Sequence, residues 1–198
     1  MHNNTLTSGK VSGLALAITL FFAHNAFSQS LSGYYSIGGE QSDFPTFRSA
    51  IHKLDSFGIS GPVVFKVKDG VYYESDTIRS VKGTSETNTI LFQSDSRDSS
   101  MVVLEWNSQK SGNWNLWLNR AGFITFKNIG FRQLFDGGKQ NVHLINCHNI
   151  AFENCLFEGS NMVMDGALLT GTVDSNLTVT NCTFQYARQG IDLHGGAK

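Results

Sequence analysis

A ten-residue phrase occurs three times in the last third of the sequence, at nearly constant spacing. The copies are ITFKNIGFRQ from Ile124, IAFENCLFEG from Ile150 and LTVTNCTFQY from Leu177, so they begin 26 and 27 residues apart. Each copy has two alternating apolar residues, then an Asn, then a Phe three residues after the Asn. Self-similarity with a period of about 20 to 50 residues is the signature of stacked repeats. The phrase therefore predicts a solenoid in which each strand lies parallel to its copy one turn earlier.

Two columns of the aligned copies predict how the turns stack. One column contains Phe131, Phe157 and Phe184. The other contains Asn128, Asn154 and Asn181. We expect the Phe rings to stack on one another and fill the interior. Asn tolerates the left-handed backbone of a tight bend, and its amide can bond the neighbouring turn. The Asn column is therefore expected to form an inward-facing ladder.

The three cysteines are sorted by the same alignment. Cys155 and Cys182 directly follow the Asn in two copies, where the earlier copy has Ile129, so a buried apolar stack is the default interpretation. A disulfide between them is compatible with the spacing of neighbouring turns but is not required. Cys147 belongs to a different strand. No Cys-x-x-Cys pair occurs, so no zinc site or other metal site is predicted.

The segment before the repeats changes from helical to strand periodicity. SDFPTFRSAIHKLDSFGISGP predicts one amphipathic helix that Ser42 or Asp43 can cap, with Pro45 in its first turn and Gly58 at its end. Its apolar stripe comprises Phe47, Ala50, Ile51 and Leu54. From Pro62 onward apolar and polar residues alternate, as in VVFKVKDG, which predicts strands separated by Gly, Asp and Ser turns.

The N-terminus has the layout of a secretory signal peptide. A polar start with one Lys precedes the apolar run VSGLALAITLFFA, and small residues precede a cleavage position before Gln29. A transmembrane anchor, the alternative, needs a longer apolar run of about 20 residues. We predict a signal peptide over residues 1–28, a strand and capping helix over 29–61 and a β-solenoid over 62–198. The solenoid is expected to be incomplete, because GIDLHGGAK begins a new turn and no closing cap follows.

These motifs resemble those of a known fold family. The pattern GIDL with ITFKN, IAFEN and LTVTN, each followed by Phe, is similar to the right-handed parallel β-helix of pectate-lyase-like proteins with its asparagine ladder. FPTFRSAIHKLDSFGISGPVVFKVKDGVYYES resembles the helix and first strand that plug such β-helices, including those of pectin methylesterases. The resemblance implies an all-β fold with an N-terminal capping helix. It specifies function weakly, because the fold carries lyases, hydrolases, esterases and non-enzymes.

The resemblance also implies where a site would lie. In this family the first strand of each turn, with the loop before it, lines a carbohydrate-binding groove. Those strands here are LWL, VHL, a stretch near LLT, and IDL, and alternation within them places Trp117, His143 and Asp192 outward on one face. We expect Trp117 to stack on a sugar ring, His143 to transfer a proton, and Asp192 to bind a cation or act as a base. The residues expected to point inward are Leu116, Leu118, Val142, Leu144, Ile191 and Leu193.

The loops before these strands add polar residues of suitable types. They are Asp136, Lys139, Asp165 and Arg188. The candidate catalytic residues are His143, Asp192 and Arg188. The candidate substrate-binding residues are Trp117, His143, Asp192, Asp136 and Asp165. The alternative interpretation is that all of these are ordinary solvated strand and loop residues. No cofactor is predicted, and the acidic cluster that would hold a calcium ion in a lyase of this kind is incomplete.

Two functions from different classes are compatible with these features. The first is a secreted or cell-surface β-helix domain that binds a polysaccharide and can process it as a lyase, glycoside hydrolase or carbohydrate esterase. The second is a non-catalytic adhesin or structural stalk. A compact acidic and basic cluster on neighbouring turns would favour the enzyme, and an evenly polar face would favour the stalk. A nucleic-acid partner is not expected, because the net charge is −1 and no Lys/Arg-rich run occurs.

Overall fold

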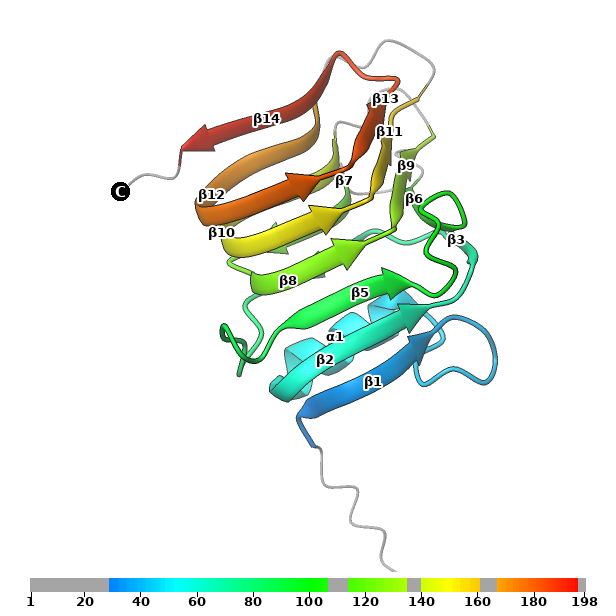
Figure 1. Cartoon of the computed structure of the whole chain (residues 1–198), viewed down its shortest axis with the longest axis vertical. Helices are drawn as coiled ribbons and strands as arrows, with labels where there is room; N and C mark the ends of the chain where they lie inside the picture. The colour runs from blue at the N-terminus through cyan, green and yellow to red at the C-terminus, as the bar shows by residue number, and fades with distance from the viewer. Residues whose placement is uncertain (1–28, 107–113, 135–139, 161–166, 196–198) are drawn as a thin grey trace, which may run out of the picture.

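The computed structural model describes residues 29–106, 114–134, 140–160 and 167–195. The strands in these ranges coil around a common interior, and each lies parallel to its counterpart one turn earlier (Figure 1). The predicted signal peptide at residues 1–28 lies outside the described residues. No helix in the described part of the chain has the length and apolar character needed to cross a membrane.

The coil has three faces, because each turn contributes up to three strand segments. The first face contains β1 (Leu31–Ile37), β2 (Ile59–Val67), β5 (Ile90–Ser94), β8 (Gly122–Lys127) and the second halves of β10 (Gln140–Glu153) and β12 (Ala167–Thr180). The second face contains β3 (Gly70–Tyr72), β6 (Val102–Trp106), β9 (Gly130–Gln133), β11 (Leu156–Glu158) and β13 (Thr183–Gln185). The third face contains β4 (Asp76–Ile78), β7 (Trp114–Asn119), the first halves of β10 and β12, and β14 (Gln189–Gly195). β10 and β12 are long strands that continue from the third face onto the first.

The repeated phrase stacks in the register that the alignment predicted. Ile124 pairs with Ile150, which pairs with Leu177. On the second face the ring centroids of Phe131 and Phe157 are 5.2 Å apart, and those of Phe157 and Phe184 are 4.6 Å apart. A second stack fills the interior behind the first face. It comprises Phe65, Phe92, Phe126 and Phe152. These parallel ring stacks, buried against one another, form the core that the repeats were expected to build.

The Asn column adopts the predicted backbone but not the predicted inward ladder. Asn128, Asn154 and Asn181 have φ of 54°, 52° and 53°, as expected at a bend. Asn128 is buried, but Asn154 and Asn181 are exposed, so the expectation of an inward-facing ladder is wrong for these two turns. The feature that all three residues share is the left-handed backbone conformation, which favours Asn.

Buried amides lie instead at another corner, on Asn115 of β7 and Asn141 of β10. The Asn115 amide donates to the carbonyls of Leu104 and Arg132 at 2.9 and 2.8 Å. Asn141 one turn later donates to the carbonyls of Phe131 and Glu158. Each amide therefore joins the end of a second-face strand to the next turn and satisfies carbonyls that the bend removes from the sheet.

The predicted helix forms as α1 (Phe47–Phe57), but its N-cap is Thr46 rather than Ser42 or Asp43. The Thr46 hydroxyl accepts the backbone N–H of Ser49 at 3.1 Å. Asp43 is occupied elsewhere, because its carboxylate accepts both the backbone N–H and the hydroxyl of Ser36. Gly58 ends the helix as predicted, with φ of 64°. A Cβ at Gly58 would also collide with the carbonyl oxygen of Lys82.

α1 caps the N-terminal end of the coil. It follows β1, whose partner is β2, and so it replaces the second- and third-face strands of the first turn. Figure 1 shows it behind β2, beside the first face. Phe47 inserts into the interior, 5.8 Å from the Phe92 ring and 5.1 Å from the Tyr72 ring. The predicted apolar stripe is buried along its length, so the helix covers core that the first turn would otherwise expose.

At the opposite end of the described coil, the register places Ile191 and Leu193 of β14 in the expected inward columns. Ile191 follows Leu116 and Val142, and Leu193 follows Leu118 and Leu144, all of which are buried. Ile191 and Leu193 are nevertheless 42% and 38% exposed. Within the described residues β14 pairs only with β12, so no described strand covers these two side chains.

Candidate functional site

The third face brings three of the sequence-predicted site residues into one outward column. Strand register aligns Thr77 with Trp117, Trp117 with His143, His143 with Thr170, and Thr170 with Asp192. Alternation along each strand directs these side chains away from the core. Trp117 and His143 are therefore direct neighbours, whereas Thr170 separates His143 from Asp192.

Trp114 joins this column as an aromatic neighbour. Its ring is 5.0 Å from that of Trp117 and stacks on the His143 imidazole at 5.8 Å with an interplanar angle of 22°. The His143 Nδ1 lies 3.1 Å from the hydroxyl oxygen of Thr170. The indole N–H of Trp117 is buried and has no partner among the described residues. The result is an aromatic and hydrogen-bonding strip, which we call the third-face strip: Trp114, Trp117, His143, Thr170 and Asp192.

The electrostatics of the strip favour neutral hydrogen bonding over ion pairing. Burial lowers the pKa of His143 below its usual value of 6.5, so the imidazole is neutral at pH 7. Asp192 is two turns away, which is about 10 Å at the usual strand spacing. The Nε2 of His194 is 3.8 Å from Asp192 Oδ1. His143 and Asp192 therefore do not form an acid–base pair in direct contact.

The remaining predicted site residues lie in a turn or outside the described residues. Arg188 is exposed in the turn between β13 and β14. Asp136, Lys139 and Asp165 lie outside the described residues. Over the ranges that are described, no group of three or more His, Cys, Asp or Glu side chains could hold a metal ion.

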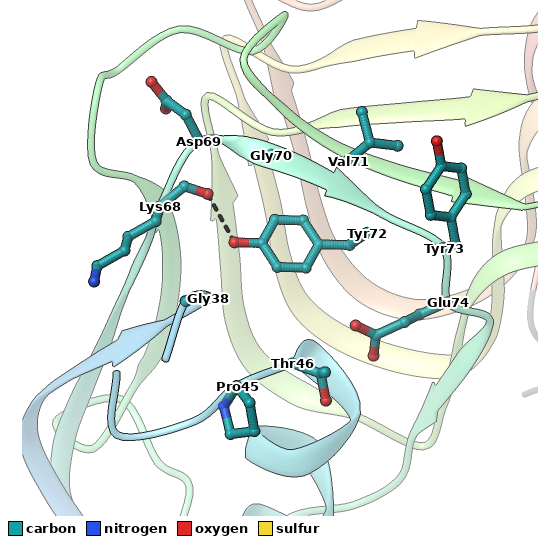
Figure 2. A pocket seen from close by; sticks show the side chains of 11 residues that line it. Gly38, Pro45, Thr46, Lys68, Asp69, Gly70, Val71, Tyr72, Tyr73 and Glu74 are labelled. Atoms are coloured by element: carbon teal, nitrogen blue, oxygen red, sulfur yellow. Dashed lines mark hydrogen bonds between the residues drawn. The ribbon is translucent and has the colours of Figure 1, made fainter. Parts of the chain in front are cut away.

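A pocket lies at the N-terminal end of the coil, where no site residue was predicted from the sequence. Its volume is about 500 Å³, and it opens between the loop before α1 and the segment that carries β3. Figure 2 shows the Tyr72 ring across its middle, Tyr73 at one side and the Glu74 carboxyl pointing toward Thr46. The Tyr72 hydroxyl donates to the Lys68 carbonyl at 2.7 Å, which fixes the ring as a wall of the pocket.

Among the residues that line this pocket, Glu74 has a pKa that is shifted to near neutral pH. It is only 8% exposed, and its Oε2 accepts the backbone N–H of Arg48 at 2.7 Å. Burial raises the pKa of Glu74 to about 7; the bond from Arg48 opposes this shift, and the carboxylate of Asp76 adds to it. Glu74 can therefore donate a proton below neutral pH and accept one above it. Burial together with the charges of Glu74 and Asp69 raises the pKa of Tyr72 to about 12, so the phenol stays protonated.

The sequence did contain a signal for Glu74. Glu74 and Asp76 are two residues apart in a segment of strand-like alternation, so both fall on one side of the chain. That side is the inner one, which is an unusual place for two carboxylates. A search for acidic residues at the alternate strand positions that are predicted to point inward would have found the pair.

The comparisons with known proteins bear on the fold. Two crystal structures of the pectin methylesterase from Aspergillus niger, one deglycosylated and one retaining an N-acetylglucosamine stub, resemble this chain with a TM-score of 0.52 and 16% sequence identity. The similarity covers 84% of this chain and 59% of the esterase chain, so this chain spans less than two thirds of that protein. No protein-family model matches the sequence, and no curated protein matches it. The predicted right-handed parallel β-helix is thus confirmed.

Proposed function

We propose that this protein binds a polysaccharide laid along the coil axis on the third-face strip. The observation that carries the proposal is the register of Trp117, His143, Thr170 and Asp192 on successive turns, with the Trp114 ring beside them. A linear polymer along the axis meets one of these side chains on every turn. Aromatic faces stack on apolar sugar faces, while the imidazole, hydroxyl and carboxylate bond sugar hydroxyls.

The other two faces support the choice of the third. On the first face Lys127 bonds Glu153 at 2.6 Å. On the second face Arg132 bridges Glu105 and Glu158 at 3.2 and 2.7 Å. The charges of these five residues are therefore paired within the protein. The third face instead gathers an aromatic pair, an imidazole, a hydroxyl and the Asp192 carboxylate in one column, a distribution that favours carbohydrate binding over an evenly polar stalk.

Binding is better supported than processing by the described residues. His143 has a hydroxyl rather than a carboxylate beside it, and about 10 Å separates it from Asp192. The likeness to a pectin methylesterase favours a polysaccharide as the ligand. Reaction chemistry on this face would require additional groups, such as those of Asp136 and Asp165.

We propose further that the protein acts outside the cytoplasm after removal of residues 1–28. The apolar run and the small residues before Gln29 support this proposal. Mass spectrometry of the protein recovered from the periplasm or medium of an expressing bacterium should find a chain that starts at Gln29. An intact N-terminus on exported protein would contradict the assigned cleavage position.

The binding proposal is tested with polysaccharide panels and matched Trp and Tyr variants. Arrays of acidic and neutral plant-type polysaccharides should show binding to the wild-type chain. Trp117→Ala and Trp114→Ala should each weaken binding about 3- to 10-fold, the loss expected for one stacking contact. Tyr34→Ala is the control, because Tyr34 is 78% exposed on the first face, away from the strip. Absence of binding by the folded protein, or an equal loss in the Tyr34 variant, would overturn the proposal.

A further inference from the structure

Cys155 and Cys182 occupy the same position on two consecutive turns. Each follows a bend residue with the same backbone conformation, Asn154 with φ of 52° and Asn181 with φ of 53°. The turns are joined on both sides of the cysteines. Asn154 N–H donates to the Thr180 carbonyl at 2.9 Å, and Thr183 N–H donates to the Cys155 carbonyl at 2.9 Å. The two cysteines are therefore held opposite each other by backbone pairing.

The two sulfur atoms also have equivalent surroundings. Cys155 Sγ lies 3.4 Å from the carbonyl oxygen of Phe126, and Cys182 Sγ lies 3.4 Å from that of Phe152, one turn later. The backbone N–H of Cys155 donates to Cys182 Sγ at 3.4 Å. Opposed residues of neighbouring parallel strands have Cα atoms about 4.8 Å apart. That spacing lies within the range of about 4.4 to 6.8 Å that a disulfide spans.

Access and acidity differ between the two thiols. Cys155 is buried, whereas Cys182 is only partly buried, so reagents in solvent meet Cys182 first. The hydrogen bond from the Cys155 thiol lowers the pKa of Cys182 to about 7, and burial raises that of Cys155. A reactive thiol at the surface with a resolving thiol behind it is the arrangement that thiol–disulfide exchange requires.

We propose that Cys155 and Cys182 form a disulfide that joins the two turns when the protein meets an external disulfide. The Cys182 thiolate attacks one sulfur of a low-molecular-weight disulfide, such as oxidised glutathione, and releases one thiolate. Cys155 then loses its proton to solvent, attacks the Cys182 sulfur of the mixed disulfide, and releases the second thiolate. Two protein thiols are oxidised and one external disulfide is reduced to two thiols, so atoms and electrons balance.

The third cysteine is the internal control. Cys147 lies in the first half of the turn, pairs in register with Val173, and its Sγ bonds the carbonyl of Leu118. Its sulfur is buried and has no contact with the other two thiols in the described structure. The bond would join two residues that are 27 positions apart in the sequence. It would fasten a turn whose Leu177, Val179 and Phe184 are only partly buried.

The bond is tested by digestion after incubation of the purified chain with oxidised glutathione and removal of excess reagent. Free thiols are blocked with iodoacetamide in denaturant, without reductant, before digestion. A protease that cuts after Glu separates the cysteines, because Glu153 and Glu158 place Cys147, Cys155 and Cys182 in different peptides. We expect peptide 154–158 linked to peptide 159–198, and Cys147 alone alkylated. Three alkylated cysteines, glutathione retained on Cys182, or a link through Cys147 would each overturn the proposal.

The number of free thiols in cysteine variants provides an independent test of the disulfide. In oxidised protein under denaturing conditions, wild type should present one free thiol, Cys147→Ser none and Cys182→Ser two. Reduction should raise these counts to three, two and two. Oxidation should raise the melting temperature of wild type and Cys147→Ser by about 5 to 10 °C, through the loop that is closed. The melting temperature of Cys182→Ser should not respond. A Cys182 variant that responds as wild type does would exclude the assigned pair.

Discussion

Arg48 of the capping helix and Asp76 of β4 form an ion pair, with Arg48 Nε 2.8 Å from Asp76 Oδ1. The Asp76 side chain is almost fully buried. Asp76 is the first residue of an inward-facing column on the third face, and it pairs in register with Leu116 on the next turn. Arg48 also donates to the Ser75 carbonyl, and its backbone N–H bonds Glu74. One residue of α1 therefore satisfies three groups at or beside β4, which fixes the cap to the first strand of the third face.

Removing this contact should loosen the cap. Arg48→Ala leaves the buried Asp76 carboxylate uncompensated, so we expect a loss of about 1 to 3 kcal/mol in the free energy of unfolding. The matched control is Arg79→Ala, because Arg79 pairs with Asp55 at 3.4 Å and is largely exposed. Its loss should be below about 0.5 kcal/mol. Urea unfolding of both variants measures the difference, and equal losses would show that the Arg48 contact does not secure the cap.

Glu74 should make stability depend on pH between about 4.5 and 7. Its pKa is raised from 4.5 to about 7 in the folded protein, so folding favours the protonated carboxyl. The stabilisation is fully present below pH 4.5 and is lost as the pH rises through 7. Glu74→Gln keeps a neutral side chain of the same shape at all pH values. The free energy of unfolding of wild type minus that of the Gln variant should fall by about 1 to 2 kcal/mol from pH 4.5 to 8. A constant difference would contradict the raised pKa.

The fold was largely predictable because its information repeats along the chain. The periodic phrase fixed the register of Phe131 on Phe157, and the change of period around Pro62 separated helix from strands. The N-cap was not predicted correctly, because the Asp43 carboxylate accepts hydrogen bonds from Ser36 instead of capping the helix. These residues are seven apart in the sequence, and no local pattern encodes their contact. The exposure of Leu193 depends on which strands lie beside β14, and a column pattern alone does not contain that information.

The candidate site was predictable only in part. Alternation placed Trp117 and His143 on one face, and the register confirms that they are neighbours. The contacts of Trp114 and Thr170 with His143 depend on the pairing of separate turns, which alignment of the phrase did not cover. The raised pKa of Glu74 arises from burial and from Asp76 on β4, against the opposing effect of Arg48 on α1. Such tertiary surroundings are invisible to a reading of local pattern.

His143 should titrate in the acid range and leave ligand binding unchanged above neutral pH. Burial lowers its pKa, so protonation is harder in the folded than in the unfolded chain, and stability is lost as the pH falls below 6.5. NMR titration of the imidazole should give a midpoint below 6.5. If the strip binds polysaccharide as a neutral surface, affinity should stay level from pH 7 to 9, and His143→Gln should bind at pH 7 within about 3-fold of wild type. A midpoint at or above 6.5 would contradict the burial argument.

The two classes of Asn should lose different amounts of stability on substitution. Asn141→Ala removes an amide that bonds the buried carbonyls of Phe131 and Glu158, so we expect a loss of about 2 to 4 kcal/mol in the free energy of unfolding. Asn154→Gly is the matched change at the bend, where φ of 52° suits glycine and the side chain is exposed. Its loss should stay below about 1 kcal/mol.

Thermal or urea unfolding of both variants decides between the two positions. A larger loss for Asn154→Gly would mean that the Asn column of the repeated phrase is the one that stabilises the coil. The expected order assigns that role to Asn115 and Asn141. These two do not form a three-fold repeat, because Leu168 occupies the equivalent position on the next turn.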